Sequence, residues 1–132
     1  LDFCHNIKDY CDHLVSQGMN VILCGDYNIA HKPIDLARPK SNEGNPGYLP
    51  EERAWMDEFT SNGYCDTFRQ FCKEPDQYSW WSYRFNAREK NIGWRIDYCC
   101  VNNSFVPFVH SSYILPQIFG SDHCPVAIEI QE

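Results

Sequence analysis

The sequence predicts an α/β domain, and the order of its apolar segments supports this fold class. An amphipathic helix, a short apolar strand and a second helix come first, and a run of short strands follows. The 132 residues, 43% of them hydrophobic, suffice for one domain with its own core. No linker or internal repeat divides the chain, so we expect a single unit over residues 1–132.

The first helix is expected over residues 3–17, where apolar side chains recur at helical spacing and Gly18 suits the helix end. The apolar run at 21–24 is typical of a buried strand. The turn residues Gly25 and Asp26 follow it directly, so we expect the strand to end there.

A long loop and a second helix are expected next. Residues 30–49 are rich in proline, glycine, asparagine and charge, and a loop of this length inside a compact domain is usually functional. Pro50 suits the first turn of a helix, and Gly63 suits its end. We expect one further helical turn over residues 66–71.

The second half of the chain predicts four strands. The loop FNAREKNIG joins the first two, and the last strand alternates apolar and polar side chains with a period of two. The four expected strands cover residues 79–83, 94–101, 109–114 and 125–130.

Charge and cysteine usage narrow the functional class. A net charge of −7 argues against a general polyanion binder, although a divalent cation would offset clustered carboxylates. The eight cysteines include no CxxC pair, so we expect reduced and mostly buried thiols in an intracellular, cytoplasmic protein. No apolar run approaches the roughly 20 residues that a membrane helix needs, and we expect no membrane partner.

Three short segments place ionisable side chains directly at the ends of apolar strands. They are Gly-Asp-Tyr-Asn at 25–28, Arg-Ile-Asp-Tyr at 95–98 and Ser-Asp-His at 121–123. A rigid sheet can aim such side chains at one point. Carboxylates that bind a hard cation or accept a proton, together with a histidine, suit phosphodiester hydrolysis.

Each segment also has a purely structural interpretation. Asp and Asn are common in turns after strands, and Ser-Asp-His is compatible with a surface loop or a helix cap. Asp97 lies inside an apolar strand, where it could form a buried salt bridge with Arg95 or another neighbour.

Longer stretches resemble the exonuclease III/abasic endonuclease family of the endonuclease/exonuclease/phosphatase superfamily. The resemblance covers roughly residues 10–130 and is carried by VILCGDYNIAHKPIDLARPKSNEGNPGYLPEERAWMDEF, DTFRQF, YSWWSYRFNAREKNIGWRIDY and GSDHCPVAIEI. It implies a four-layered α/β sandwich of which this chain forms the carboxy-terminal half: a mixed, largely antiparallel sheet with helices on one face.

The resemblance implies roles for five polar residues. Asp26 would position or deprotonate the attacking water, and Asn28 would orient the water and the phosphate. Asp97 would pair with His123, which would stabilise charge on the phosphate. Asp122 matches a carboxylate close to the metal, so Asp26, Asn28 and Asp122 are the expected ligands of Mg²⁺, with Mn²⁺ as the alternative.

The resemblance also implies a substrate pocket. Trp80 and Trp94 would wall a pocket for an extrahelical abasic sugar, and Ile96 would close its floor. Such an apolar pocket admits a sugar without a base and excludes a nucleotide that carries one. The alternative for each tryptophan is ordinary core packing.

Three further residues match family positions near DNA. Asn42 and Asn45 would approach the DNA backbone, although Glu43 and Gly44 stand where basic residues often occur. Arg84 lies in a loop where a wedge side chain would enter DNA. The alternative for the two asparagines is a solvated loop.

The expected substrate is double-stranded DNA with abasic sites or 3′ ends. The resemblance implies hydrolysis of the phosphodiester 5′ to an abasic site, with 3′→5′ exonuclease and 3′-phosphatase activities in the full-length protein. Two alternatives are another metal-dependent phosphoesterase of the superfamily and a non-catalytic binding module.

Family members are about twice this length, and their amino-terminal half supplies the main metal-binding glutamate. We therefore expect this chain to be inactive alone and to self-associate, because an inner sheet face would lack its cover. The residues expected on that face are Val21, Leu23, Val126 and Ile128.

Overall fold

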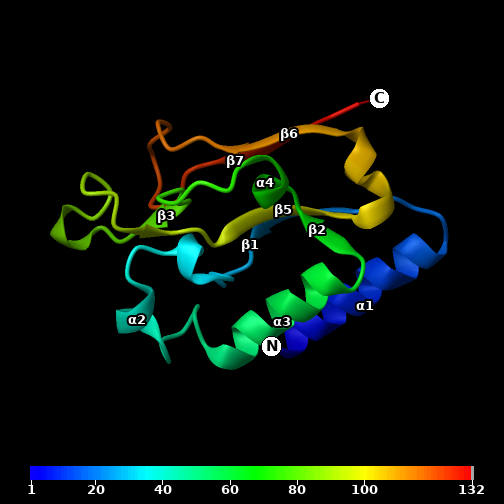
Figure 1. Cartoon of the computed structure of the whole chain (residues 1–132), viewed down its shortest axis with the longest axis horizontal. Coiled ribbons are helices and arrows are strands. Elements are labelled where there is room, and N and C mark those ends of the chain that lie inside the picture. The colour runs from blue at the N-terminus through cyan, green and yellow to red at the C-terminus, as the bar shows by residue number, and fades with distance from the viewer. Residues whose placement is uncertain (132) are drawn as a thin grey trace.

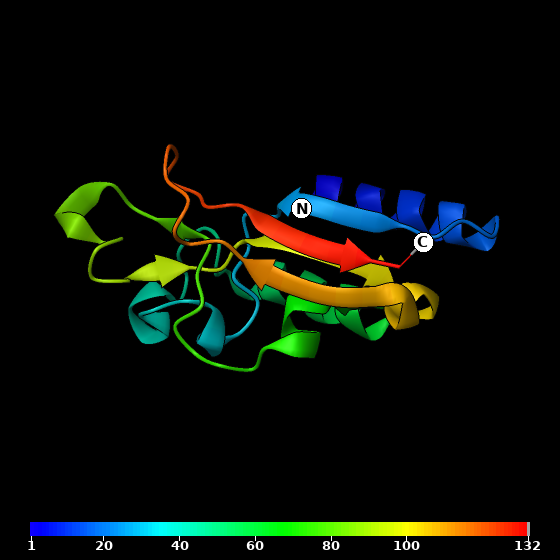
Figure 2. The same cartoon turned by 90° about the horizontal axis from the view of Figure 1, so that it is seen from above.

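The computed structural model describes residues 1–131 and has an α/β architecture in layers. Figure 1 shows helices α1 (Asp2–Ser16) and α3 (Pro50–Ser61) side by side on one face of a small sheet. Strands β6 (Val109–Ile114) and β7 (Val126–Ile130) lie on the opposite side of that sheet, as Figure 2 also shows from above.

The central sheet has the order β1-β5-β2, with both pairings antiparallel. Strand β5 (Asp97–Asn102) lies between β1 (Ile22–Asp26) and the short strand β2 (Tyr64–Asp66). Four of the six residues of β5, at positions 98–101, are apolar and buried, which fits the central position of this strand. The register sets the last residue of β1 opposite the first residue of β5.

The main core lies between this sheet and the two long helices. Trp55 and Phe59 of α3 stack at 4.9 Å, and Phe59 stacks on Tyr64 of β2 at 4.4 Å. Cys11 of α1 is buried in the same cluster. Each helix therefore uses one apolar face to cover the sheet.

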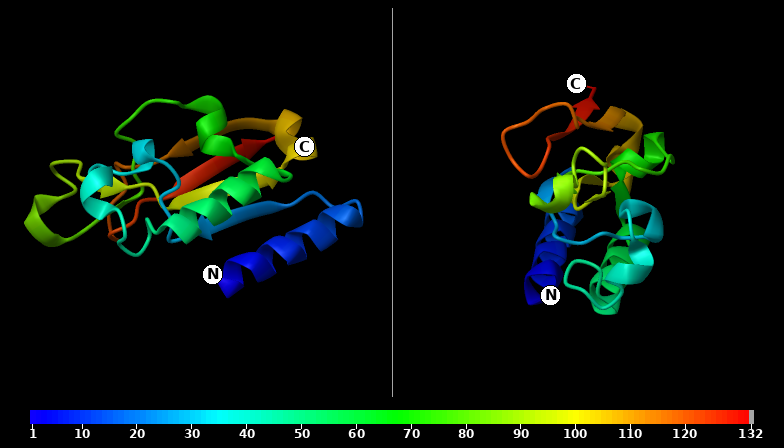
Figure 3. Two further views of the ribbon diagram at one scale, coloured as in Figure 1. Left: turned by 60° about the horizontal axis from the view of Figure 1, so that its bottom comes forward. Right: turned by 90° about the vertical axis from the view of Figure 1, so that its left-hand side faces the viewer.

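Most of the short elements gather at the other end of the molecule, on the left in Figure 1 and in the left view of Figure 3. This end faces the viewer in the right view of Figure 3. Strands β3 and β4 pair there as a two-residue ladder. The remaining elements are the 3₁₀ helices η1 (Pro33–Asp35), η2 (Arg84–Asn86) and η3 (Asn103–Phe108), helices α2 (Pro39–Asn42) and α4 (Thr67–Phe71), and strands β3 (Trp80–Trp81) and β4 (Gly93–Trp94).

Both long helices are confirmed within a few residues. Five other expected elements are also confirmed, namely β1, β3, α4, β6 and β7. The expected strand over 94–101 divides into β4 and β5, because the backbone N–H groups between them do not pair with another strand. That of Arg95 donates to the Asp35 carbonyl, and that of Ile96 donates to Ser79 Oγ. The expected loop over 30–49 contains η1 and α2, and β2 was missed because it has only three residues.

The expectation of a buried first strand was wrong for half of its side chains. Val21 and Leu23 pack against the core beneath the helices, so they do not form the open face. Ile22 is 39% exposed and Cys24 is also exposed, because alternate residues of a strand point to opposite faces. Val126 and Ile128 are half-buried on β7.

All eight cysteines are free thiols, as expected, but only four of them are buried. The Sγ atoms of Cys24 and Cys99 lie 2.9 Å apart across the β1-β5 pair. Within residues 1–131, no helix combines the length and the apolar character that a membrane crossing requires.

Candidate active site

The candidate site begins where strands β1 and β5 meet in register. Asp26 is the last residue of β1, and it lies opposite Asp97, the first residue of β5. The backbone N–H of Asn28 donates to Asp26 Oδ1 at 2.8 Å, which fixes the turn after the strand. Asn28 has a φ of 56°, a left-handed conformation that Asn tolerates better than most residues.

His123 joins the two carboxylates from a distant part of the chain. Its Nδ1 lies 2.8 Å from Asp97 Oδ2, and its Nε2 lies 3.7 Å from Asp26 Oδ2. A carboxylate accepts hydrogen bonds, so Nδ1 carries the proton that is donated to Asp97. One ligand atom from each of the three residues lies within 4.8 Å of the others.

The protonation of this cluster is perturbed in both partners. Burial raises the pKa of Asp97, and the hydrogen bonds from His123 and Ser79 offset this only in part. Burial alone would lower the pKa of His123, but the hydrogen bond and charge of Asp97, together with Asp26 and Asp122, raise it overall. The imidazolium form is therefore more stable here than in a histidine without these carboxylates.

Asp97 does not form the alternative salt bridge with Arg95. The Arg95 guanidinium is fully buried and donates instead to Asp35 Oδ1 at 2.8 Å and to both oxygens of Asp66. Arg69 donates to Asp35 as well. Residues two apart in a regular strand point to the same side. The chain breaks between β4 and β5 at Arg95 and Ile96, so the strand pattern alone did not predict the different partners of Arg95 and Asp97.

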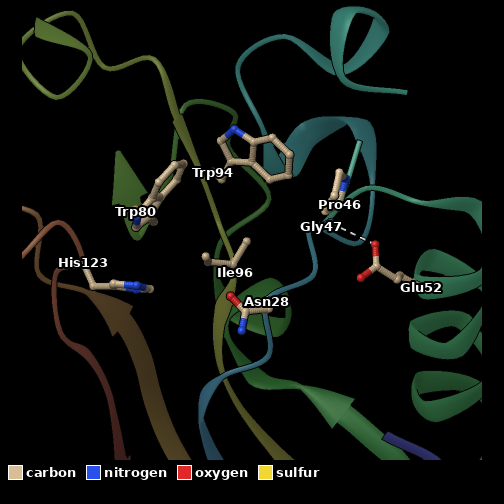
Figure 4. Close-up of a pocket in the computed structure, with 8 residues that line it drawn as sticks. All are labelled: Asn28, Pro46, Gly47, Glu52, Trp80, Trp94, Ile96 and His123. Atoms are coloured by element: carbon tan, nitrogen blue, oxygen red, sulfur yellow. Dashed lines mark hydrogen bonds between the residues drawn. The ribbon is translucent and has the colours of Figure 1, made fainter. Parts of the chain in front are cut away.

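An apolar pocket of about 370 Å³ opens next to this cluster. Figure 4 shows Trp80 and Trp94 on one side of the pocket, with Ile96 and Asn28 nearer its base. The two indole rings meet edge to face at a centroid distance of 6.3 Å, and Ile96 is only 7% exposed. The residues that line the pocket are Asn28, Pro46, Gly47, Glu52, Trp80, Trp94, Ile96 and His123.

The sequence therefore predicted seven residues that the structure brings together in one place: Asp26, Asn28, Trp80, Trp94, Ile96, Asp97 and His123. Asp26, Asp97 and His123 form the ionisable cluster, and His123 also faces the pocket of the tryptophans. An antiparallel backbone bridge between Trp80 and His123 holds the ionisable cluster beside the pocket.

Asp122 is directed differently from its neighbour His123. The Trp80 indole Nε1 donates to Asp122 Oδ2 at 3.0 Å, and Ser121 Oγ donates to Oδ1 at 3.3 Å. The indole hydrogen bond is the main cause that lowers the pKa of Asp122. Among residues 1–131, the compact group of possible metal ligands contains Asp26, Asp97 and His123, without Asp122.

The residues expected near DNA lie beside the pocket. Asn42 and Arg84 line a second hollow of about 480 Å³, whose wall includes the same Trp80 and Trp94. Asn45 does not line this hollow but donates through Nδ2 to Asn42 Oδ1 at 3.1 Å. The basic residues Arg38 and Lys90 also line it.

Two residues that support the site, Ser79 and Glu52, were not singled out from the sequence. Ser79 Oγ accepts from the backbone N–H groups of Ile96 and Asp97, at 3.0 and 3.1 Å. Glu52 Oε1 accepts from Gly47 and Leu49, so it holds the loop that faces the pocket. The sequence Pro-Glu-Glu at 50–52 signalled a helix start, but not that this glutamate would reach back to the pocket.

Gly47 approaches Trp94 too closely for any side chain. A Cβ at this position would lie 2.9 Å from the indole Cζ3, and the φ of Gly47 is +93°. Glycine is therefore required here by both the contact and the backbone conformation.

The comparisons with known proteins agree with this geometry. The model of the endonuclease/exonuclease/phosphatase family matches residues 5–123. Recombination repair protein 1 of Drosophila melanogaster is 49% identical over 111 residues, which are 82% of this chain and 16% of that protein. The exodeoxyribonuclease of Bacillus subtilis is 45% identical over 117 residues, which are 88% of this chain and 46% of that protein.

The fold is similar to that of a solved AP endonuclease from Leishmania major, with a TM-score of 0.90 and 30% identity. The match covers 98% of this chain and 43% of the solved chain. The chain thus spans less than half the length of these relatives, and the expected fold class is confirmed as part of their α/β fold. The chain belongs to the endonuclease/exonuclease/phosphatase family, and the resemblance to its abasic endonucleases is confirmed.

Proposed function

We propose that this member of the endonuclease/exonuclease/phosphatase family is part of a metal-dependent DNA-repair nuclease. The whole protein would hydrolyse the phosphodiester 5′ to an abasic site and would also act as a 3′→5′ exonuclease and 3′-phosphatase. The observation that carries this proposal is the Asp26–His123–Asp97 cluster beside an apolar pocket walled by Trp80 and Trp94.

Asp97 orients His123 in the proposed reaction. The hydrogen bond from Nδ1 to Asp97 leaves Nε2 free on the side that faces Asp26. A protonated Nε2 donates to a phosphate oxygen and stabilises the negative charge that grows on it. The raised pKa of His123 supports this role, because it widens the pH range over which the ring is protonated.

Asp26 and Asn28 act on the attacking water. The Asp26 side chain is 37% exposed and therefore remains open to solvent. It accepts the proton of the water, and the amide of Asn28 orients the water and the phosphate.

The donor set fits a hard divalent cation only in part. Asp26 and Asp97 offer carboxylate oxygens, but Asp97 is hydrogen-bonded to His123. Mg²⁺ prefers six oxygen ligands and keeps several waters, so a few protein oxygens suffice for part of its shell. We assign Asp26, Asn28 and Asp122 to the ion, with Mn²⁺ as the alternative.

The bound ion would polarise the phosphate and offset its charge. Asp122 reaches the ion in this proposal only if it shares its carboxylate with the Trp80 indole.

The pocket between the tryptophans selects a sugar that lacks its base. Its volume of about 370 Å³ is bounded on one side by two indole rings and below by Ile96. A flipped abasic sugar brings its 5′ phosphate toward His123, which lines the same pocket. Core packing is the weaker interpretation of these tryptophans, because both line open hollows.

Asn42, Asn45 and Arg84 are assigned to the DNA backbone. Asn42 and Arg84 share a hollow with Arg38 and Lys90, which supplies local positive charge on a chain whose net charge is −7. Phosphate contacts from amides and arginines fix the register of a protein on duplex DNA.

We further propose that residues 1–132 form the carboxy-terminal half of the catalytic domain, and that the amino-terminal half completes the site. The chain covers 46% of the Bacillus subtilis relative, and the face of β1 that carries Ile22 and Cys24 is exposed. The isolated chain is then inactive and self-associates through this face. Sedimentation of a monodisperse, active monomer would contradict this assignment.

The experiment is incision of a duplex that contains one abasic site, with a base-containing duplex as the matched substrate. The natural protein that carries this chain is assayed with Mg²⁺, with EDTA, and as the Asp26→Asn variant. We expect incision only with the metal and the abasic duplex, and a loss of about 10²-fold or more in Asp26→Asn. Equal rates for Asp26→Asn would refute the role of Asp26, and incision of neither duplex would favour another phosphoesterase or a binding module.

A further inference from the structure

We propose that Arg88 is a positioning residue for Asp122 and His123, because its guanidinium fixes the loop that leads into them. This inference rests on the proposed function for its effect on catalysis. The loop itself, residues 116–121, is exposed along its whole length. An exposed loop needs a restraint if it is to hold two side chains in one geometry.

Backbone hydrogen bonds to residues 79–81 hold the chain directly after this loop. The backbone N–H of Trp81 donates to Asp122 O at 3.1 Å, and that of Cys124 donates to Ser79 O at 2.8 Å. These bonds fix residues 122–124 but do not reach the preceding turn.

Arg88 supplies the restraint on the preceding turn. Its Nη1 donates to Ser121 O at 3.0 Å, and its Nη2 donates to Pro116 O and Ile118 O at 2.9 and 2.8 Å. Three backbone carbonyls spread over six residues therefore converge on one planar group.

The guanidinium plane is also held on its faces. Its Cζ lies 4.6 Å from the ring centroid of Trp81 and 4.1 Å from that of Phe119. Trp81 belongs to β3 and is 3% exposed, whereas Phe119 belongs to the loop and is 73% exposed. The arginine thus joins a buried, rigid ring to a ring of the exposed loop, and cation–π contacts favour this arrangement.

Arg88 has little capacity left to bind a phosphate. Both Nη atoms are used by carbonyls, and Nε is buried without a partner among the described residues. A DNA-contacting arginine would instead keep its fork open, as the exposed side chain of Arg84 does.

The same contacts explain why lysine would not replace this arginine. An ammonium group can donate to carbonyls, but it cannot span three of them in one plane while it stacks between two rings. The change Arg88→Lys keeps the charge and removes the geometry, so it separates positioning from electrostatic attraction.

The test compares Arg88→Lys and Arg88→Ala with Lys73→Ala, which removes an equal charge from an exposed residue that lines neither the pocket nor the second hollow. The first readout is the indole N–H signal of Trp80, which donates to Asp122. We expect its hydrogen exchange to quicken by about 10-fold or more in both Arg88 variants. The signal of Trp55, in the core beneath the helices, serves as the internal reference.

The second readout is steady-state incision by the natural protein that carries this chain. We expect kcat to fall by about 10- to 100-fold in both Arg88 variants, with KM and its salt dependence unchanged. Lys73→Ala should keep the kcat of the unsubstituted protein. A rise in KM with constant kcat would make Arg88 a phosphate contact, and an unchanged Trp80 signal would overturn the positioning role.

The two readouts keep the two proposals apart. If the unsubstituted protein fails to incise abasic DNA but Arg88→Lys still alters the Trp80 signal, the proposed function is wrong and the positioning role stands. If Arg88→Ala fails to fold, the milder Arg88→Lys provides the same two measurements.

Discussion

Two ionic clusters lie on either side of the start of β5, and they differ in how their charges are satisfied. Arg95 is 0% exposed and Asp35 is 1% exposed, and the guanidinium donates to both Asp35 and Asp66. Arg69 completes this closed cluster with a further hydrogen bond to Asp35. Its charges are compensated within the fold, which is the condition for burying them.

The second cluster begins two residues later and is open. Asp97 and His123 form one hydrogen bond, but the His123 side chain is 31% exposed and that of Asp26 is 37% exposed. Several lone pairs and one ring nitrogen remain available to a substrate or an ion. Burial and complete pairing therefore indicate an ion cluster that stabilises the fold, whereas partial pairing beside a pocket indicates a cluster that takes part in catalysis.

The largest expected effect is a loss of stability when the closed cluster loses one of its charges. The change Asp35→Ala leaves Arg95 buried with one partner fewer, and we expect the free energy of unfolding to fall by about 3–5 kcal/mol. Urea denaturation measures this loss. The control Asp9→Ala, at an exposed carboxylate of α1, should change stability by no more than about 0.5 kcal/mol. A similarly small change in Asp35→Ala would show that the cluster is not structural.

The next effect concerns the open cluster. The change Asp97→Asn keeps the shape of the side chain but removes the charge that orients His123, and we expect kcat for abasic-site incision to fall by about 10²- to 10³-fold. Circular dichroism should show a retained fold. Asp9→Asn is the control for activity, and an unchanged kcat in Asp97→Asn would remove Asp97 from the mechanism.

The pH dependence of stability should have opposite signs in the two clusters. The pKa of Asp35 is lowered: burial alone would raise it, but the guanidinium of Arg95 and the hydrogen bonds from Arg95 and Arg69 outweigh that cost. This cluster therefore contributes stability above the ordinary Asp pKa, and that contribution is lost as pH falls through the lowered value.

The pKa of His123 is raised, so its contribution to stability is present below the ordinary His pKa of 6.5 and is lost as pH rises through the folded value. Urea unfolding without added metal, from pH 5 to 9, measures this slope. We expect His123→Gln to flatten the decline at and above neutral pH while the loss of stability in acid persists. An identical decline in both proteins would contradict the assignment to His123.

The smallest effect expected is at Asp122. In Trp80→Phe the indole donor disappears, so we expect the pKa of Asp122 to rise toward its ordinary value. Carbon-detected NMR titration of the carboxyl groups follows this change. Trp94→Phe is the matched control, since Trp94 packs against Trp80 without donating to Asp122. An equal rise in both variants would show that the indole hydrogen bond is not the cause.

The sequence by itself determined the fold class, the two long helices and the three segments that carry the ionisable residues. Helical spacing over 3–17, the proline at 50 and the period of two at the last strand are local patterns that indicate the type of secondary structure directly. The resemblance then indicated that Asp26, Asp97 and His123 belong to one site, and their ligand atoms indeed lie within 4.8 Å.

Only the tertiary structure decided which partner each charge takes. Arg95 and Asp97 are both charged and close in sequence, yet the first pairs with Asp35 and Asp66 and the second with His123. These partners are 26 to 60 residues away in the chain, so sheet register and loop packing select them.

The tertiary structure also determined which face of β1 is exposed, the hydrogen bond between Trp80 and Asp122, and the contacts by which Arg88 holds the loop. Each depends on side chains that meet through the fold, across 42 residues for Trp80 and Asp122. Local patterns indicate which helices and strands form, whereas the fold determines which side chains are covered and what covers them.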